Sequence, residues 1–194
     1  IAYYEAVSTD LKLAYSTDAG LTWTVRGLET SANNVGQYAA VALNGTRVFA
    51  GYYDATTGDL RFGRAATPTD PFTSAKVDSA VNVGQYCSLR WDAASGTVWL
   101  AYHDVTNGAL KIAYSPVNDA NWQPQITVDS DGVTGLYASL DGGKWWLHLA
   151  KAIPTASVMD LAIQAKEGDL VIATHGRAVW VLDDLTPLRE LTGE

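Results

Sequence analysis

The sequence of 194 residues contains a single cysteine, Cys87, and no long apolar run. One cysteine excludes an internal disulfide, a zinc site built from cysteines and a redox-active cysteine pair. No run approaches the ~20 apolar residues that a helix needs to cross a bilayer. The first residues, Ile-Ala-Tyr-Tyr-Glu, have neither the basic start nor the apolar core of a signal peptide. We therefore expect a fold that is stabilised by packing alone.

Positive charge is also scarce. The 13 Lys and Arg residues are outnumbered by 21 Asp and Glu residues, which gives a formal net charge of −8. The basic residues form no cluster along the chain. Nucleic acids and anionic membranes are bound by concentrated positive patches, so both classes of partner are excluded.

The residues that are abundant favour strands over helices. There are seven Trp and ten Tyr, together with many Val, Thr and Gly residues. Aromatic and β-branched residues fit a pleated, half-buried surface, and glycine is typical of tight turns. The composition predicts an all-β protein.

A repeat with a period of about 49 residues dominates the sequence. The segments Ile-Ala-Tyr-Tyr-Glu at 1–5, Ala-Gly-Tyr-Tyr-Asp at 50–54 and Leu-Ala-Tyr-His-Asp at 100–104 are spaced by 49 and then 50 residues. A second marker, Asn-Val-Gly-Gln-Tyr, occurs at 34–38 and again at 82–86. Self-similarity at a fixed period of this size is typical of repeat architectures.

Each repeat predicts four short strands, which in the second repeat cover 38–43, 47–53, 60–64 and 72–77. The turn at 44–46 contains Asn-Gly, a strong hairpin pattern, and a looser turn covers 54–58. Four antiparallel strands in a unit of this length are typical of a β-propeller blade. The whole chain predicts sixteen strands, or about four blades.

Residues 16–23 carry the pattern Ser-x-Asp-x-Gly-x-x-Trp, and residues 139–146 carry it again. This pattern resembles the Asp box of sialidases and other BNR-repeat proteins, and residues 115–122 form a degenerate third copy. We expect a turn between the third and fourth strands, in which Asp closes the turn, Gly takes a positive φ and Trp packs the loop onto the blade. The resemblance implies a structural element that is remote from any active site.

Residues 133–194 resemble the closing part of sortilin-like and BNR-type bacterial propellers, most specifically in Thr-His-Gly-Arg at 174–177. In those proteins the Gly-Leu-Tyr strand is the third of its blade, whereas the repeat of residues 1–132 starts a new blade there. The chain therefore looks like a join of two propeller families within a single domain, 1–194. The resemblance implies an extracellular or cell-surface location.

Closure of the ring has two solutions. The first repeat begins at its second strand, so residues 178–183 could pair beside 1–5 and close a monomeric ring of about four blades. Such closure removes open sheet edges. Alternatively, one chain is half of a larger ring that a second copy completes as a homodimer.

Antiparallel pairing places many of the repeated polar and aromatic residues at one rim, opposite the Asp boxes. Aromatic faces beside amides and carboxylates are typical of sugar sites, so this rim is the candidate binding site for a glycan or a protein ligand. The alternative is that these side chains only satisfy hydrogen bonds between blades. The candidate residues are Tyr4, Gln37, Tyr38, Tyr53, Asp54, Gln85, Tyr86, His103 and Asp104.

The sequence favours a non-catalytic scaffold over an enzyme. None of the arginines has the sequence context of the sialidase carboxylate clamp, although Tyr4 with Glu5, or Asp54 with Asp104, could form a catalytic pair on paper. A glycoside hydrolase is thus the alternative function. The three histidines have no metal-ligand spacing, and the oxygen-rich turn at 54–59 is not matched in the next repeat, so we expect no metal and no cofactor.

Overall fold

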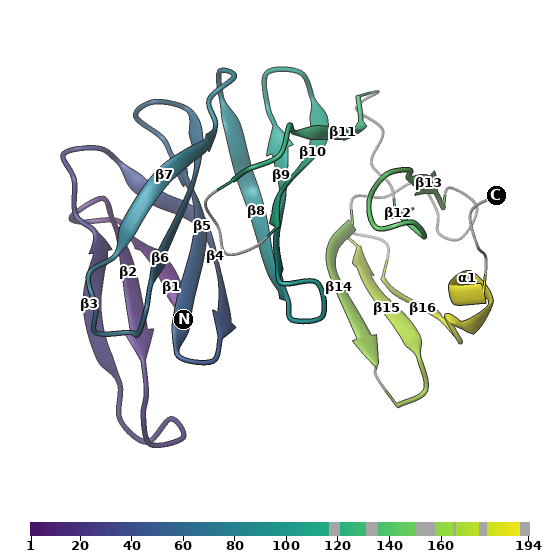
Figure 1. Ribbon diagram of the computed structural model, residues 1–194, viewed down its shortest axis with the longest axis horizontal. Helices are drawn as coiled ribbons and strands as arrows, with labels where there is room; N and C mark the ends of the chain where they lie inside the picture. Colours follow the sequence, from purple (N-terminus) through teal and green to yellow (C-terminus); the bar gives the residue numbers. More distant parts are fainter. Residues whose placement is uncertain (117–120, 131–135, 150–157, 165, 175–177, 191–194) are drawn as a thin grey trace. The chain divides into compact units, whose positions relative to one another are not determined.

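The computed structural model describes residues 1–116, 121–130, 136–149, 158–164, 166–174 and 178–190. The chain divides into two compact units, Ile1–Asp131 and Gly132–Glu194. The described residues form sixteen strands in antiparallel sheets and one short helix, α1 (Thr186–Glu190) (Figure 1). The predicted all-β class is confirmed.

The first unit contains three sheets that follow one another along the chain. The first sheet has the order β1-β2-β3 and consists of Ala2–Glu5, Asp10–Tyr15 and Thr24–Glu29. The second has the order β4-β5-β6-β7 and consists of Val35–Asn44, Arg47–Asp54, Asp59–Ala65 and Thr73–Asp78. The third has the order β8-β9-β10-β11 and consists of Val83–Asp92, Thr97–Asp104, Ala109–Pro116 and Ile126–Asp129. The four strands predicted for a repeat are therefore present.

Turn chemistry sets the register of these sheets. Asn44 pairs with Arg47, so β4 and β5 are joined by a two-residue hairpin in which Gly45 has a φ of 59°. The turn between β5 and β6 is closed by a hydrogen bond of 2.8 Å from the Gly58 amide to the Asp54 carbonyl. Both turns lie where the sequence predicts them.

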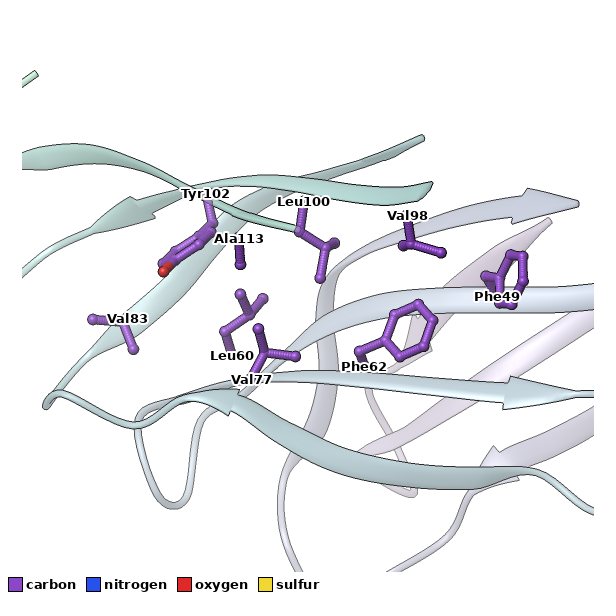
Figure 2. Close-up of a cluster of buried hydrophobic side chains, with 9 residues drawn as sticks. All are labelled: Phe49, Leu60, Phe62, Val77, Val83, Val98, Leu100, Tyr102 and Ala113. Atoms are coloured by element: carbon purple, nitrogen blue, oxygen red, sulfur yellow. The ribbon is translucent and has the colours of Figure 1, made fainter. Parts of the chain in front are cut away.

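The core lies between successive sheets. Apolar side chains of the second sheet meet those of the third in one cluster, which Figure 2 shows: Phe49, Leu60, Phe62, Val77, Val83, Val98, Leu100, Tyr102 and Ala113. A second cluster joins the first sheet to the second: Leu11, Leu13, Leu28, Val35, Val48, Ala50 and Tyr52. Successive sheets of the first unit thus bury their facing apolar sides against each other.

The glycine of the Asn-Val-Gly-Gln-Tyr marker permits this packing. A Cβ atom on Gly36 would lie 2.7 Å from the Cα of Leu11, and one on Gly84 would lie 2.7 Å from the Cα of Leu60. Both glycines also have a positive φ, of 102° and 106°. A side chain at either position would force the sheets apart.

The second unit contains two smaller sheets. One pairs β12 (Tyr137–Ala138) with β13 (Leu147–His148), and the other has the order β14-β15-β16, from Val158–Gln164, Asp169–Thr174 and Val179–Leu182. Its core contains Leu136, Leu170, Ile172 and Leu185. No helix among the described residues is long and apolar enough to cross a membrane.

The strand predicted over 178–183 is β16, and it pairs with β15. Residues 1–5 contribute β1, which pairs with β2 in a sheet of three strands within the described part of the chain. Ring closure and blade number therefore stay predictions. The Thr-His-Gly-Arg stretch lies outside the described residues from 175 to 177, and so does part of the degenerate box at 115–122.

Candidate functional site

Four aromatic side chains from the second and third sheets meet at one end of these sheets. We call Tyr38, Tyr53, Tyr86 and His103 the tyrosine patch. The ring centroids of Tyr38 and Tyr86 lie 4.6 Å apart, Tyr38 lies 6.1 Å from Tyr53, and Tyr86 lies 6.3 Å from His103. Tyr38 and Tyr86 are 37% and 66% exposed, so the centre of the patch faces solvent.

The backbone presents these two tyrosines in an uncommon conformation. Tyr38 and Tyr86 both have a φ of 53°, in the left-handed region that residues other than glycine rarely adopt. Each follows a paired glutamine, and the ladder slips at that point between Gln37 and Ala40 and between Gln85 and Ser88. Bulges of this kind redirect a side chain, and left-handed non-glycine residues cluster at functional sites.

Amide side chains support the patch from the adjacent turns. Asn82 Oδ1 accepts a hydrogen bond of 2.7 Å from the Tyr53 hydroxyl and one of 3.3 Å from Gln85 Nε2. Gln37 Nε2 likewise donates to Asn34 Oδ1 at 3.2 Å. Both asparagines are the first residue of an Asn-Val-Gly-Gln-Tyr marker. Their repetition could therefore have indicated a role in the site, although they were not among the predicted site residues.

The two aspartates expected in the site are buried instead. Asp54 is 0% exposed and Asp104 is 2% exposed. Asp54 accepts hydrogen bonds from Asn33 Nδ2 and from the Thr56 amide, and Asp104 accepts bonds from the Asn107 amide and side chain. Both therefore close turns, and their placement in a ligand site is corrected.

Tyr4, the residue of the first repeat that corresponds to Tyr53, is not joined to the patch. It is half-buried on β1, and no ring of the described residues stacks on it. The adjacent Glu5 accepts hydrogen bonds from the amides of Val7 and Ser8. Hydrogen bonding to Ser8 lowers the pKa of Glu5. Glu5 is thus a turn residue that stays ionised and is unsuited to act as a general acid.

The two Ser-x-Asp-x-Gly-x-x-Trp loops have the same hydrogen bonds. In the first loop the Gly20 amide donates to Ser16 Oγ at 2.8 Å, the Thr22 amide donates to Asp18 Oδ1 at 2.9 Å, and Trp23 Nε1 donates to the Gly20 carbonyl. The second loop repeats this pattern through its own residues, which are Ser139, Asp141, Gly143, Trp145 and Trp146.

The first loop joins β2 to β3, and the second joins β12 to β13, which form a two-stranded sheet. Both loops connect antiparallel neighbours, and their position between the third and fourth strands of a blade stays a prediction. The first loop is at the opposite end of its sheet from the turn after Glu5, because β2 runs between the two. One expectation is wrong: Trp23 is 52% exposed and holds the loop through the Gly20 carbonyl rather than by burial against the sheet.

The carboxylates considered for catalysis from the sequence are those of Glu5, Asp54 and Asp104, and all three accept hydrogen bonds from turn residues. Asp54 and Asp104 are committed to turns, so the carboxylate pair considered for glycoside hydrolysis is not available to a substrate. The described part of the chain contains no group of three or more His, Cys, Asp or Glu side chains placed to hold a metal. In the turn at 54–59, Asp59 forms an ion pair of 2.5 Å with Lys76. Desolvation raises the pKa of the Cys87 thiol to about 12.

Comparisons with known proteins add little to this geometry. No family model matches the chain, and no curated protein matches it. A solved structure described as bifunctional GH43-CE, from Bacteroides eggerthii, is similar over 90% of this chain at 10% identity and a TM-score of 0.30. This chain spans 28% of the length of that one. A likeness at this level carries no argument about fold or function.

Proposed function

We propose that this protein is a non-catalytic β-propeller repeat scaffold whose tyrosine patch binds a carbohydrate. The observation that carries the proposal is the exposed pair of Tyr38 and Tyr86, held side by side by left-handed backbone at two successive bulges. A sugar ring offers apolar C–H faces to aromatic rings and hydroxyl groups to amides. The patch supplies both, because Gln37 and Gln85 flank the tyrosines.

The charge around the patch points to a neutral glycan. Its own side chains are phenols, amides and an imidazole, and the nearest aspartates of the repeat, Asp54 and Asp104, are buried and hydrogen bonded. No arginine or lysine belongs to the patch. An acidic sugar would find no counter-charge there, whereas a neutral oligosaccharide needs none.

Three features support the propeller part of the proposal. The sheets repeat with the sequence, they pack face to face in succession, and β1, β4 and β8, the first strands of their sheets, lie side by side. The two Ser-x-Asp-x-Gly-x-x-Trp loops support a place among BNR and Asp-box proteins, and with it an extracellular or cell-surface location. The alternative of a glycoside hydrolase is less well supported, because Asp54 and Asp104, the pair considered for it, are buried.

A glycan array probed with the intact protein tests the proposal. We expect binding to one or more neutral oligosaccharides, and we expect Tyr86→Ala to abolish it while Leu21→Ala, an exposed residue of the first Ser-x-Asp-x-Gly-x-x-Trp loop, binds as the wild type does. Equal binding by both variants would place the ligand elsewhere. Hydrolysis of chromogenic glycosides by the wild type would overturn the non-catalytic assignment.

A further inference from the structure

The tyrosine patch is built from two copies of the same local structure. In the first Asn-Val-Gly-Gln-Tyr marker, Gln37 Nε2 donates a hydrogen bond of 3.2 Å to Asn34 Oδ1. In the second marker, Gln85 Nε2 donates one of 3.3 Å to Asn82 Oδ1. The tyrosine that follows the glutamine has a φ of 53° in both copies. The two halves of the patch therefore have nearly the same internal geometry.

The two markers are also attached to the sheets in the same way. In each marker the valine amide donates a hydrogen bond of 2.9 Å to a carbonyl in a turn of the preceding sheet, that of Thr9 for the first marker and that of Gly58 for the second. In each marker the asparagine carbonyl accepts a hydrogen bond from a turn of its own sheet, from the amide of Ala55 or of Val105. These backbone bonds hold both halves in the same conformation before a ligand binds, which lowers the cost of binding.

Each half offers the same chemical groups to a ligand. It combines one aromatic ring, that of Tyr38 or Tyr86, with the adjacent glutamine amide, whose orientation is fixed by its bond to the asparagine. The oxygen of such an amide accepts hydrogen bonds. An aromatic face for C–H groups and an acceptor for a hydroxyl are what a single sugar unit requires. We therefore call Gln37 with Tyr38 the first subsite and Gln85 with Tyr86 the second.

The two subsites are neighbours. The ring centroids of Tyr38 and Tyr86 lie 4.6 Å apart. The subsites are also joined by a hydrogen bond, because Tyr53, which pairs with Gln37 in the register, donates its hydroxyl to Asn82 Oδ1 at 2.7 Å. A sugar bound at one subsite thus has the other within reach of the next unit of its own chain.

We infer that the ligand is an oligosaccharide that repeats one sugar, and that two consecutive units of it occupy the two subsites. The inference rests on the proposed carbohydrate function. Two equivalent subsites select two equivalent units, since a sugar that fits one subsite also fits the other. Joining the units makes the second contact intramolecular, so the affinity rises steeply from one unit to two.

Calorimetric titration of the wild type with saccharides of defined length tests the inference. The ligands are the neutral sugar that binds best on the glycan array, as the monosaccharide and as its homodisaccharide, and a disaccharide of the same linkage in which one unit is a sugar that does not bind alone. We expect the homodisaccharide to bind at least ~100-fold more tightly than the monosaccharide, and we expect the mixed disaccharide to lose this gain.

A smaller gain, or an equal gain for the mixed disaccharide, overturns the inference. The proposal of carbohydrate binding stands in both of these cases. A wild type that binds no saccharide at all overturns the inference and the proposed function together.

Variants of the two glutamines supply a second test. We expect Gln37→Ala and Gln85→Ala to weaken homodisaccharide binding to the same extent, by ~10-fold each, because each removes one hydrogen bond from an equivalent subsite. The monosaccharide keeps one intact subsite in either variant, and its affinity there stays that of the wild type. Gln123→Ala is the matched control, because Gln123 donates to the Asn121 carbonyl outside the patch, and it binds as the wild type does. Weakened binding in only one of the two glutamine variants overturns the inference, and so does unchanged binding in both.

Discussion

Tyr38 and Tyr86 occupy the same position in two successive repeats, and their ring centroids lie 4.6 Å apart. The pair depends on the packing of two successive sheets. The close packing of β4 against β8 brings the two bulges together, and each bulge directs its tyrosine to the same end of the sheets. Because the tyrosine recurs in both repeats, the two side chains form one continuous aromatic surface.

The glycine of the marker is required for sheet packing. Gly84→Ala places a Cβ 2.7 Å from the backbone of Leu60 at a φ of 106°. We expect the free energy of unfolding to fall by more than about 2 kcal/mol, since strain and overpacking add. Gly108→Ala is the matched control, because it has a φ of 64° and nothing within 4 Å, and it should cost about 1 kcal/mol. Urea unfolding of both variants checks this, and equal losses would contradict the packing role.

The buried acid at the end of the second sheet depends on both of its partners. Tyr102→Phe removes one hydrogen bond but leaves Lys111 beside Asp78, so we expect a loss of about 1–2 kcal/mol. Lys111→Met leaves a buried carboxylate without its cation and should cost about 3–5 kcal/mol. Lys166→Met removes an exposed lysine instead and should change the unfolding free energy by less than about 1 kcal/mol. A Lys111→Met protein as stable as the wild type would show that the contact does not hold the sheets together.

The first Ser-x-Asp-x-Gly-x-x-Trp loop gives stability an acid dependence. Hydrogen bonds from the Thr22 side chain and amide, with one from Ser16, lower the pKa of Asp18 from 3.8 to about 2. The folded pKa lies below the unfolded one, so this stabilisation is complete above about pH 4 and is lost as the pH falls toward 2. Asp18→Asn removes the titrating group, and its unfolding free energy should fall less steeply over that interval. Parallel curves for the two proteins would mean that the carboxylate does not close the turn.

The fold could be predicted from the sequence to the extent that local chemistry determines it. The Asn-Gly turn, the Asp-Ala-Thr-Thr-Gly turn and the alternation of the strands each depend on residues that are close together in the sequence. The predicted strands of the repeat accordingly agree with β4 to β7. The prediction that Trp23 packs onto the blade was wrong, because the burial of a loop side chain depends on its tertiary contacts, and this loop extends beyond its sheet.

The candidate site was predicted less well, for a reason of geometry. Antiparallel pairing predicted a common rim, with Tyr38 opposite Tyr52 or Tyr53 and Tyr86 opposite His103; in the structure Tyr38 lies near Tyr53, and Tyr86 lies near His103. It could not show that Asp54 turns inward to cap its own loop, because the register gives neighbours but not the direction of a side chain at a strand end. The left-handed φ of both tyrosines was equally hidden, since nothing in their residue type favours it.

The most direct test of the proposed function is isothermal titration calorimetry with the oligosaccharide that binds best on the array. We expect Tyr38→Ala and Tyr86→Ala each to weaken the affinity at least ~10-fold, which corresponds to about 1.4 kcal/mol per variant. Trp23→Ala removes an aromatic residue of intermediate exposure, 52% against 37% for Tyr38 and 66% for Tyr86, from the loop between β2 and β3, and its affinity should equal that of the wild type. Circular dichroism confirms that each variant is folded. Weakened binding by Trp23→Ala, with wild-type affinity in both tyrosine variants, would contradict the assignment of the tyrosine patch as the binding site.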